Sequence, residues 1–372
     1  MKEELKTELK KSLVINWFTE NEVKGGTEVI TTKLSKLFNS DILSYPLCCN
    51  LTNTQFKPYY NGSFINRGIV IEKYLTELVK FNKPDFIIRN SAIGGMNSPN
   101  VPTITIFQDP FKDIGKFLEK LNFSHIESDL LDEYIFTYPE FQKLTGKNSY
   151  NVAVSNFMAD YMKDLGIECH RIIPHSVDYD LFKPGDISND FFEEHNLDKD
   201  KISKYKKVGL WIGKAHPLKW HFMDKLIIEN DDIYWICIFS YPVEGKPKSE
   251  NVKFINAIPR EKLVDFYNFA DFLVCTSAVE SFNLVALESL SCNTPVIAQR
   301  TGFFNDFNSC PGVLLCDNSL MDFKKAIKQL LETDIIADTR TLITEMYNYN
   351  GWKKSWENAV NEAIIHHNNQ NI

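Results

Sequence analysis

Strand-like apolar segments alternate with amphipathic helical segments along the chain, and this alternation restricts the fold more than any other feature. In the first half, strands are expected at residues 13–18, 86–88, 103–107 and 151–154, and helices are expected to begin at Thr27 and Asn156. Strands that alternate with helices favour a parallel sheet covered by helices on both faces. The first half is therefore predicted to be an α/β domain.

The alternation stops at residues 172–184 and then begins again. Pro174 and Pro184 bound this segment and disfavour a continuous helix or strand, so we place a domain boundary here, between residues 176 and 177. The second set of expected elements consists of strands at 208–212, 233–238, 252–255, 272–275 and 295–298, with helices from Trp220, at 260–269 and at 320–331. The sequence thus predicts two Rossmann-like, doubly wound parallel-sheet domains, residues 1–176 and 177–350.

Residues 351–372 are expected to form a C-terminal helix. Trp352, Trp356, Val360 and Ile364 fall on one face of it, so it is predicted to pack back toward the N-terminal domain. Parallel-sheet domains bind ligands at the carboxyl ends of their strands, so the active site is expected in the cleft that the two domains face across.

Composition excludes several classes of protein. The chain of 372 residues is 44% hydrophobic and carries a formal net charge of -8, which argues against a broad nucleic-acid surface. Its eight cysteines lack paired metal-ligand spacing and are expected to be reduced thiols of a cytoplasmic protein. No apolar stretch reaches the length of a membrane span, which leaves peripheral membrane association open.

The segment from Glu280 to Glu288 carries the strongest chemical signal. Two carboxylates are separated by seven residues, and a helix is expected to begin near Asn283, after a strand. The N-terminus of that helix offers free N–H groups and a partial positive charge, which suit a phosphate. Acids on either side of an anion site suit a ligand with hydroxyl groups at both ends and a diphosphate between them. A nucleotide-sugar has this layout.

Two lysines follow the first strand of the second domain. Gly213 comes directly before Lys214 at the end of that strand, and Lys219 lies near the start of the next helix. Ammonium groups here would neutralise a diphosphate, and donors aimed at developing charge typically contribute about a hundredfold in rate.

Five segments, in this order, resemble the retaining glycosyltransferases of family 4, which have the two-domain GT-B architecture. The segments are Gly25-Gly26-Thr27-Glu28, the crossing from Val154 to Pro184, Gly213-Lys214 with Lys219, the stretch from Asn251 to Asp271, and Glu280 to Glu288. The likeness is dense from about residue 150 to 300 and thin before that.

This resemblance implies a retaining, metal-independent hexosyltransferase without a cofactor. The donor would be a UDP- or GDP-sugar, and the acceptor a hydroxyl of a glycan, a lipid or a small molecule. Glu280 would bind the transferred sugar, Glu288 the ribose hydroxyls, and Lys214 and Lys219 the diphosphate. The implied donor-binding residues are Gly25, Gly26, Gly213, Lys214, Lys219, Asn256, Glu280, Ser281, Phe282, Asn283, Leu284 and Glu288.

Several positions depart from the family pattern. Gln108 stands where the family commonly has a histidine, Asn283 replaces a glycine, and Lys214 replaces an arginine. Two readings of Asp109 stay open: it contacts the sugar or accepts the acceptor's proton, or it caps the turn at Pro110. Gln108 and Asp109 are both candidate catalytic residues, beside Lys214, Lys219 and Glu280.

Three alternative functions also stay open. A nucleotide-sugar epimerase or a phosphorylase would share the fold, although no lysine context for pyridoxal phosphate is recognisable. A sugar-nucleotide-binding module without catalysis is the alternative that Gln108 favours. Uracil and guanine donors are not distinguished by the sequence. The acceptor is expected to bind at loops of the first domain, residues 48–66 and 91–100, which have no recognisable motif.

Overall fold

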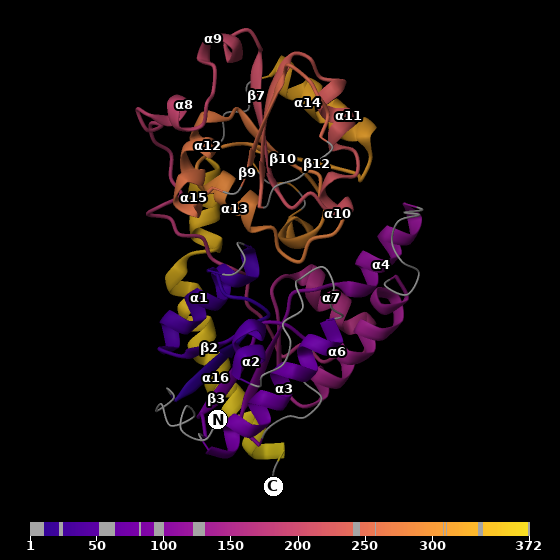
Figure 1. Cartoon of the computed structure of the whole chain (residues 1–372), viewed down its shortest axis with the longest axis vertical. Coiled ribbons are helices and arrows are strands. Elements are labelled where there is room, and N and C mark those ends of the chain that lie inside the picture. Colours follow the sequence, from indigo (N-terminus) through magenta and orange to yellow (C-terminus); the bar gives the residue numbers. More distant parts are fainter. Residues whose placement is uncertain are drawn as a thin grey trace. The chain divides into compact units, whose positions relative to one another are not determined.

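The computed structural model describes residues 11–21, 25–51, 64–81, 83–92, 100–121, 131–240, 246–256, 258–307, 309, 311–333 and 338–370. The chain divides into two compact units (Figure 1). The first comprises Met1–His175 and Asn350–Ile372, and the second comprises Ser176–Tyr349. The dividing point lies one residue before the boundary expected from the two prolines.

The first unit is built on a parallel sheet of six strands in the order β2-β1-β3-β4-β5-β6. Its strands are β1 (Ser12–Ile15), β2 (Asp41–Leu43), β3 (Phe86–Arg89), β4 (Thr103–Phe107), β5 (Tyr150–Ala153) and β6 (Arg171–Ile172). Its helices are α1 (Gly26–Phe38), α2 (Tyr45–Leu51), α3 (Phe64–Phe81), α4 (Phe111–Lys120), the π-helix η2 (Glu133–Thr137), α6 (Tyr138–Lys147), α7 (Asn156–Asp164) and α16 (Tyr349–Gln370).

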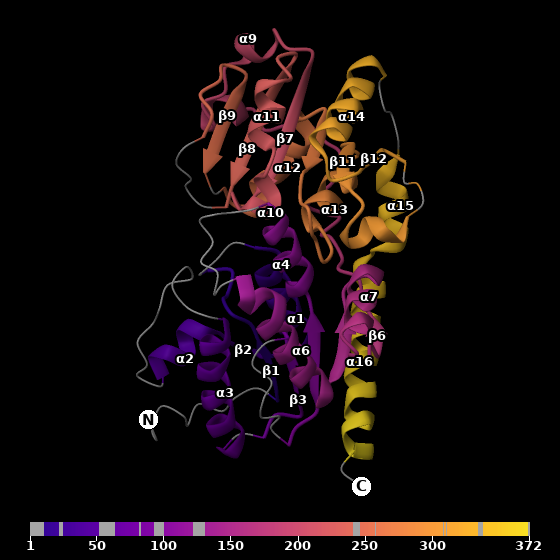
Figure 2. The same ribbon diagram turned by 90° about the vertical axis from the view of Figure 1, so that its right-hand side faces the viewer.

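Helices pack on both faces of this sheet. Apolar side chains of α2 and α3, such as Cys48 and Leu75, pack with Leu13 and Ile87 of the strands on one face. Helix α16 lies on the opposite side of the sheet (Figure 2), where Tyr150 of β5 hydrogen-bonds to a glutamate of α16. The predicted helix at residues 351–372 therefore belongs to the first unit.

The second unit has its own six-stranded parallel sheet, in the order β12-β11-β10-β7-β8-β9. Its strands are β7 (Lys207–Gly213), β8 (Ile233–Phe239), β9 (Val252–Asn256), β10 (Phe272–Cys275), β11 (Val296–Gln299) and β12 (Val313–Cys316). Its helices are α8 (Phe191–Glu194), α9 (Lys199–Ile202), α10 (Pro217–Trp220), α11 (Met223–Ile228), η3 (Arg260–Lys262), α12 (Leu263–Phe269), α13 (Leu284–Ser291), η4 (Gly302–Asp306), α14 (Leu320–Glu332) and α15 (Thr339–Met346).

The core of the second unit explains its continuous apolar strands. All seven side chains of β8 are buried, as expected for a central strand covered on both faces. Helices α11 and α14 pack on one face through Leu226 and Phe323, whereas α12 and α13 lie on the other (Figure 1).

Some expected element boundaries are wrong for local reasons. Strand β1 ends at Ile15 rather than residue 18, because the Asn16 side chain donates to the Phe18 carbonyl and turns the chain. Trp220 ends the short helix α10 instead of starting a longer one, and residues 260–262 form a 3₁₀ helix before α12. Helix α15 was not predicted.

Strand order locates the place in each sheet where a ligand site is expected. In the second unit the order reverses between β7 and β10, and in the first it reverses between β1 and β3. Loops that leave such neighbouring strands in opposite directions open a crevice at the carboxyl ends. The predicted residues Lys214, Lys219 and Glu280 all follow β7 or β10.

Candidate functional site

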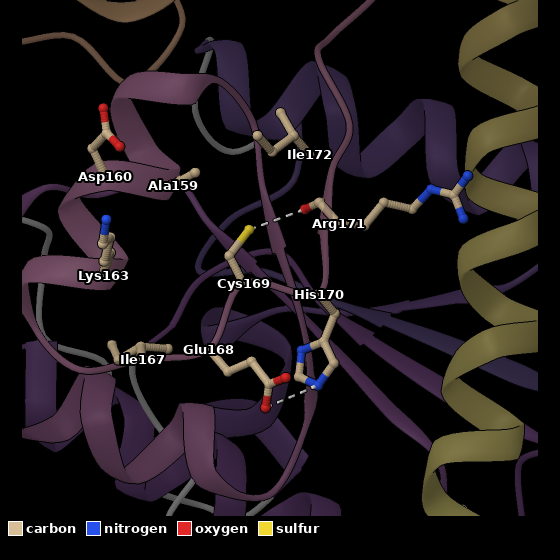
Figure 3. Close-up of a pocket in the computed structure, with 9 residues that line it drawn as sticks. All are labelled: Ala159, Asp160, Lys163, Ile167, Glu168, Cys169, His170, Arg171 and Ile172. Carbon is tan, nitrogen blue, oxygen red and sulfur yellow. Dashed lines mark hydrogen bonds and ion pairs between the residues drawn. The ribbon is translucent and has the colours of Figure 1, made fainter.

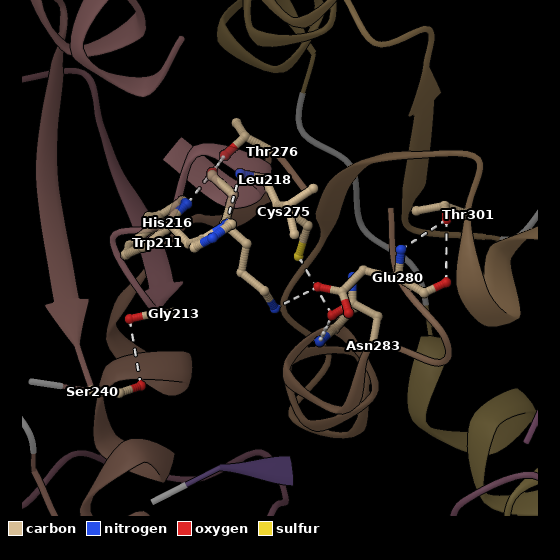
Figure 4. A network of polar contacts seen from close by, with 12 residues as sticks. Trp211, Gly213, His216, Leu218, Ser240, Cys275, Thr276, Glu280, Asn283 and Thr301 are labelled. Atoms are coloured by element: carbon tan, nitrogen blue, oxygen red, sulfur yellow. Dashed lines mark hydrogen bonds and ion pairs between the residues drawn. The ribbon is translucent and has the colours of Figure 1, made fainter. Parts of the chain in front are cut away.

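Lys219 and Glu280 meet at the carboxyl end of the sheet in the second unit. The Lys219 ammonium lies 2.5 Å from Oε1 of Glu280, and the two side chains are 33% and 14% exposed. Figure 4 shows Glu280 above the start of α13. A pair this accessible stabilises the fold by about 1 kcal/mol or less. Folding stability alone therefore explains little of its placement.

The segment that carries Lys219 is tied to the loop after β10. Ala278 donates its backbone N–H to the Leu218 carbonyl at 2.8 Å, and the Thr276 hydroxyl donates to the Lys219 carbonyl. The indole N–H of Trp211, on β7, donates to the Thr276 hydroxyl at 3.2 Å (Figure 4). The loops that follow the two central strands are thus held together.

Glu280 is fixed through its backbone. Its N–H donates to the Thr301 hydroxyl at 3.0 Å (Figure 4), and Phe303 donates to the Phe282 carbonyl at 3.1 Å. Gly302 lies between them with φ of +60°, and a Cβ there would be 2.5 Å from the Phe282 oxygen. Only glycine tolerates both conditions without a shift of the loop.

Asn283 caps α13 as the sequence predicts. Its side-chain oxygen accepts the N–H of Ala286 at 3.2 Å, which satisfies one of the first orphan donors of the helix. Its backbone, however, has φ of +87°, in the left-handed region where glycine is favoured. The substitution of the family's usual glycine thus combines a gained cap with a strained backbone.

Glu288 is held by two other residues of the second unit. Its Oε1 accepts from Arg260 Nε at 2.9 Å and Nη2 at 2.6 Å, and its Oε2 accepts from the Tyr267 hydroxyl at 2.9 Å. The residue is only 3% exposed. The predicted contact with ribose hydroxyls stays a prediction, and these three bonds restrict it.

His216 lies between Lys214 and Lys219 in the sequence. Its backbone donates to the Lys214 carbonyl at 2.7 Å, and its ring Nδ1 accepts the Leu218 N–H at 3.2 Å. Burial, followed by the nearby charges of Lys219 and Lys214, lowers the pKa of His216 to about 4. The ring is therefore neutral at pH 7 and serves as the N-cap of α10.

Gln108 belongs to a buried network in the first unit. Its amide nitrogen donates to the Asn90 side chain, and its oxygen lies 3.4 Å from His175 Nε2. Asn90 in turn donates to the Thr31 hydroxyl and the Thr27 carbonyl of α1, at 2.8 and 2.7 Å. Burial, and then Lys33, lowers the pKa of His175 to about 3, so this ring is neutral as well. Gln108 is only 6% exposed, and its catalytic role stays a prediction.

The remaining predicted residues occupy varied positions. Asp109 accepts through its backbone carbonyl from Phe111 and Gln142, and the N-cap position of α4 is Pro110 rather than Asp109. Gly25 is the N-cap of α1. The other residues are Gly26, which opens α1, Asn256, which is exposed at the end of β9, Ser281 and Leu284, which are half-buried, and Phe282, which is buried against Phe303.

A pocket of about 480 Å³ lies elsewhere, along α7 and the segment that leads into β6 (Figure 3). Its lining includes Asp160, Lys163, Glu168 and His170, and none of the predicted site residues. Within the described ranges, no group of three or more His, Cys, Asp or Glu residues could hold a metal ion. Metal independence remains a prediction.

Two further properties concern the described part of the chain. Seven cysteines have free thiols there, and Cys310 lies outside the described residues. No helix in this part is both long and apolar enough to cross a membrane.

The fold is similar to that of solved proteins. The whole chain is similar in structure to sucrose-phosphate synthase from Thermosynechococcus elongatus, with a TM-score of 0.74 and 15% identity, covering 95% of this chain and 99% of that one. It is also similar to Anabaena HepE in complex with UDP and glucose, with a TM-score of 0.68 and 12% identity, covering 94% and 99%. The expected GT-B-like fold is confirmed.

The sequence comparisons place one segment of the chain in a known family. Residues 240–346 match the family described as Glycosyl transferases group 1, so the predicted resemblance to family 4 is confirmed in this segment. D-inositol 3-phosphate glycosyltransferase of Corynebacterium jeikeium is 35% identical over 216 residues, which is 52% of this chain and 50% of that protein. This chain spans half the length, or less, of the curated relatives that it matches.

Sequence reasoning missed three groups that shape the site. Thr301 and Gly302 follow β11 after one intervening residue, Arg300, and a Thr-Gly pair soon after a strand is a sequence signal for a turn. Arg260 carried no such signal, because an arginine in a polar loop is usually solvated. The structure places Arg260 beside Glu288, with its Nη2 2.6 Å from Oε1.

Proposed function

We propose that this protein is a retaining glycosyltransferase that moves a hexose-type sugar from a nucleoside diphosphate sugar to a hydroxyl group. The observation that carries the proposal is the Lys219–Glu280 pair, which lies in the strand-order reversal of the second unit, next to the capped start of α13. Ligands of doubly wound sheets bind at this position. The family match of residues 240–346 supports the same reaction.

Each residue of the pair has a distinct role in this proposal. Lys219 stabilises the charge that develops on the diphosphate as the bond to the sugar breaks, and Lys214 contributes a second cation. Glu280 accepts hydrogen bonds from hydroxyls of the transferred sugar. Because Lys219 and Glu280 contact each other in the structure, the donor would separate them and provide each with a new partner.

A uridine diphosphate sugar is the preferred donor of this proposal, because HepE, which shares the fold, forms a complex with UDP and glucose. The name of the relatives suggests a phosphorylated polyol as acceptor. The free thiols favour a cytoplasmic location. A glycan or a lipid with a free hydroxyl would be handled by the same donor chemistry.

Thermal-shift measurements with UDP, GDP and ADP, and with their glucose conjugates, test the donor. Stabilisation follows ligand concentration relative to the dissociation constant, so the correct base gives the largest shift. Product analysis with the best donor then separates transfer from isomerisation. An isomerised donor without transfer would indicate an epimerase.

The second candidate is a sugar-nucleotide-binding module without catalysis. It is favoured by Gln108, whose amide cannot take up a proton and is already bonded to Asn90. Tight binding of the donor, with no turnover in the presence of a broad panel of hydroxyl acceptors, would support this candidate.

A further inference from the structure

The bonds on Glu288 limit what a ligand can do there. An ionised carboxylate has about four acceptor positions, two on each oxygen. Arg260 takes both positions on Oε1, and the Tyr267 hydroxyl takes one on Oε2. One position, on Oε2, has no hydrogen-bond partner among the described residues.

Arg260 is itself held in place. Its guanidinium lies over the ring of Phe182, 4.7 Å from the ring centroid, so stacking and the ion pair restrict it together. Its side chain is 25% exposed, whereas that of Glu288 is 5% exposed. Arg260 is therefore more exposed than the carboxylate that it binds, and its two hydrogen bonds to Oε1 fix the rotation of the carboxylate group.

Tyr267 fixes the other oxygen. Burial, and then the Glu288 carboxylate, raise the pKa of Tyr267 well above its usual value, so its hydroxyl keeps its proton and donates. The ring is fully buried in the second unit and cannot swing away. Both oxygens of Glu288 are thus oriented before any ligand arrives.

This inference rests on the proposed function. We propose that Arg260 is a positioning residue that, together with Tyr267, leaves Glu288 one acceptor position. Glu288 then accepts a hydrogen bond from only one of the two ribose hydroxyls of the donor nucleotide. A carboxylate free on both oxygens would accept from the 2′- and 3′-hydroxyls together. The specificity of the site then depends on a guanidinium that does not touch the nucleotide.

Isothermal titration with UDP, 2′-deoxy-UDP and 3′-deoxy-UDP tests this proposal in the wild-type protein. One analogue is expected to bind about tenfold more weakly than UDP, because it loses a hydrogen bond to a charged group. The other is expected to bind within about threefold of UDP. If GDP binds better in the screen, the guanosine analogues take their place.

The Arg260→Met variant is expected to lose this selectivity between the two analogues, because both oxygens of Glu288 can then turn toward the ribose. Arg260→Lys restores part of it through a single ammonium on Oε1. The matched control is Lys262→Met, which removes an exposed cation two residues away that pairs with Glu194 at 2.8 Å. That control keeps the wild-type selectivity.

A kinetic measurement separates positioning from general damage. With the best donor, Arg260→Met is expected to change KM and leave kcat within about twofold, because only binding of the ribose changes. Tyr267→Phe keeps the ring in the core and provides a second variant if Arg260→Met fails to fold. It is expected to lose the selectivity in the same way.

The outcomes are distinct. Equal affinities for UDP and both analogues, equal weakening of both analogues, or unchanged selectivity in Arg260→Met would each overturn the inference and leave the proposed function standing. If none of UDP, GDP and ADP binds to the wild-type protein, the proposed function fails and the inference fails with it.

Discussion

At the carboxyl end of the sheet in the second unit, the candidate site consists of charged side chains that reach solvent. The equivalent edge of the first unit carries neutral groups, Asn90, Gln108 and His175, which are buried and bonded to one another. A diphosphate requires cations at the point where it binds, so that chemistry leaves a pattern of charged residues in the sequence. An acceptor hydroxyl requires only hydrogen bonds, which many residue types can supply.

The largest expected effect tests the charged site. Lys219→Met should reduce kcat about 100- to 1,000-fold, because it removes a donor aimed at charge that develops in the transition state. Initial rates of sugar transfer with the best donor measure the effect. Lys225→Met, an exposed lysine on α11, is the matched control. A Lys219 variant with wild-type kcat would show that the charged site of the second unit is a surface ion pair.

Alanine substitutions at two glycines with positive φ, one in each unit, compare how strongly the surroundings restrict the backbone. Gly302→Ala should destabilise the protein by about 3 kcal/mol, because the new Cβ is strained and meets the Phe282 carbonyl. Gly166, in the first unit, has a positive φ as well, of +72°, but nothing lies within 4 Å of a Cβ added there. Gly166→Ala should therefore lower the free energy of unfolding by only about 1 kcal/mol. Urea denaturation measures both. Equal losses would mean that the loop after β11 adapts freely.

The pH dependence of stability tests the neutral network of the first unit. Burial lowers the pKa of His175 from 6.5 to about 3, so the unfolded chain binds a proton in this range that the folded chain does not. Stability is therefore lost as the pH falls below 6.5, and His175 contributes a loss of about 2 kcal/mol between pH 7 and pH 5.

His175→Gln keeps an amide beside Gln108 and removes the titrating group. The variant should lose about 2 kcal/mol less than the wild-type protein when urea denaturation is compared at pH 7 and pH 5. His216, with its pKa lowered to about 4, continues to contribute in both proteins. If the wild-type protein and the variant lose stability equally, His175 is not held neutral by the fold.

The same contrast explains how much could be predicted from the sequence. Strands β4 and β10 and the start of α7 match their expected bounds, because runs of β-branched and apolar residues and a serine cap are local signals. Glu280 and Lys219 were found because their spacing follows from a short strand–loop–helix unit. These signals depend on neighbours in the chain.

Contacts between distant residues could not be predicted in this way. The bond between Gln108 and Asn90 joins the ends of β3 and β4, and the pair of Arg260 with Glu288 joins a 3₁₀ helix to α13. Neither pair has a fixed spacing in the sequence, because the chain between its two residues can change in length without changing the contact. Much of the expected acceptor region, residues 48–66 and 91–100, lies outside the described residues.

The smallest expected effect concerns Asn283, where the second unit departs from the family pattern. Asn283→Gly would relieve the left-handed backbone but remove the side chain that caps Ala286. These two effects oppose each other, so the free energy of unfolding should change by only a few tenths of a kcal/mol. Asn283→Ala loses the cap and keeps the strain, and should cost about 2 kcal/mol. Urea denaturation of the two variants, with UDP affinity beside it, measures the balance. A large loss in the glycine variant would mean that the cap, rather than the backbone, determines where α13 begins, and the phosphate site proposed at its N-terminus would then depend on the asparagine side chain.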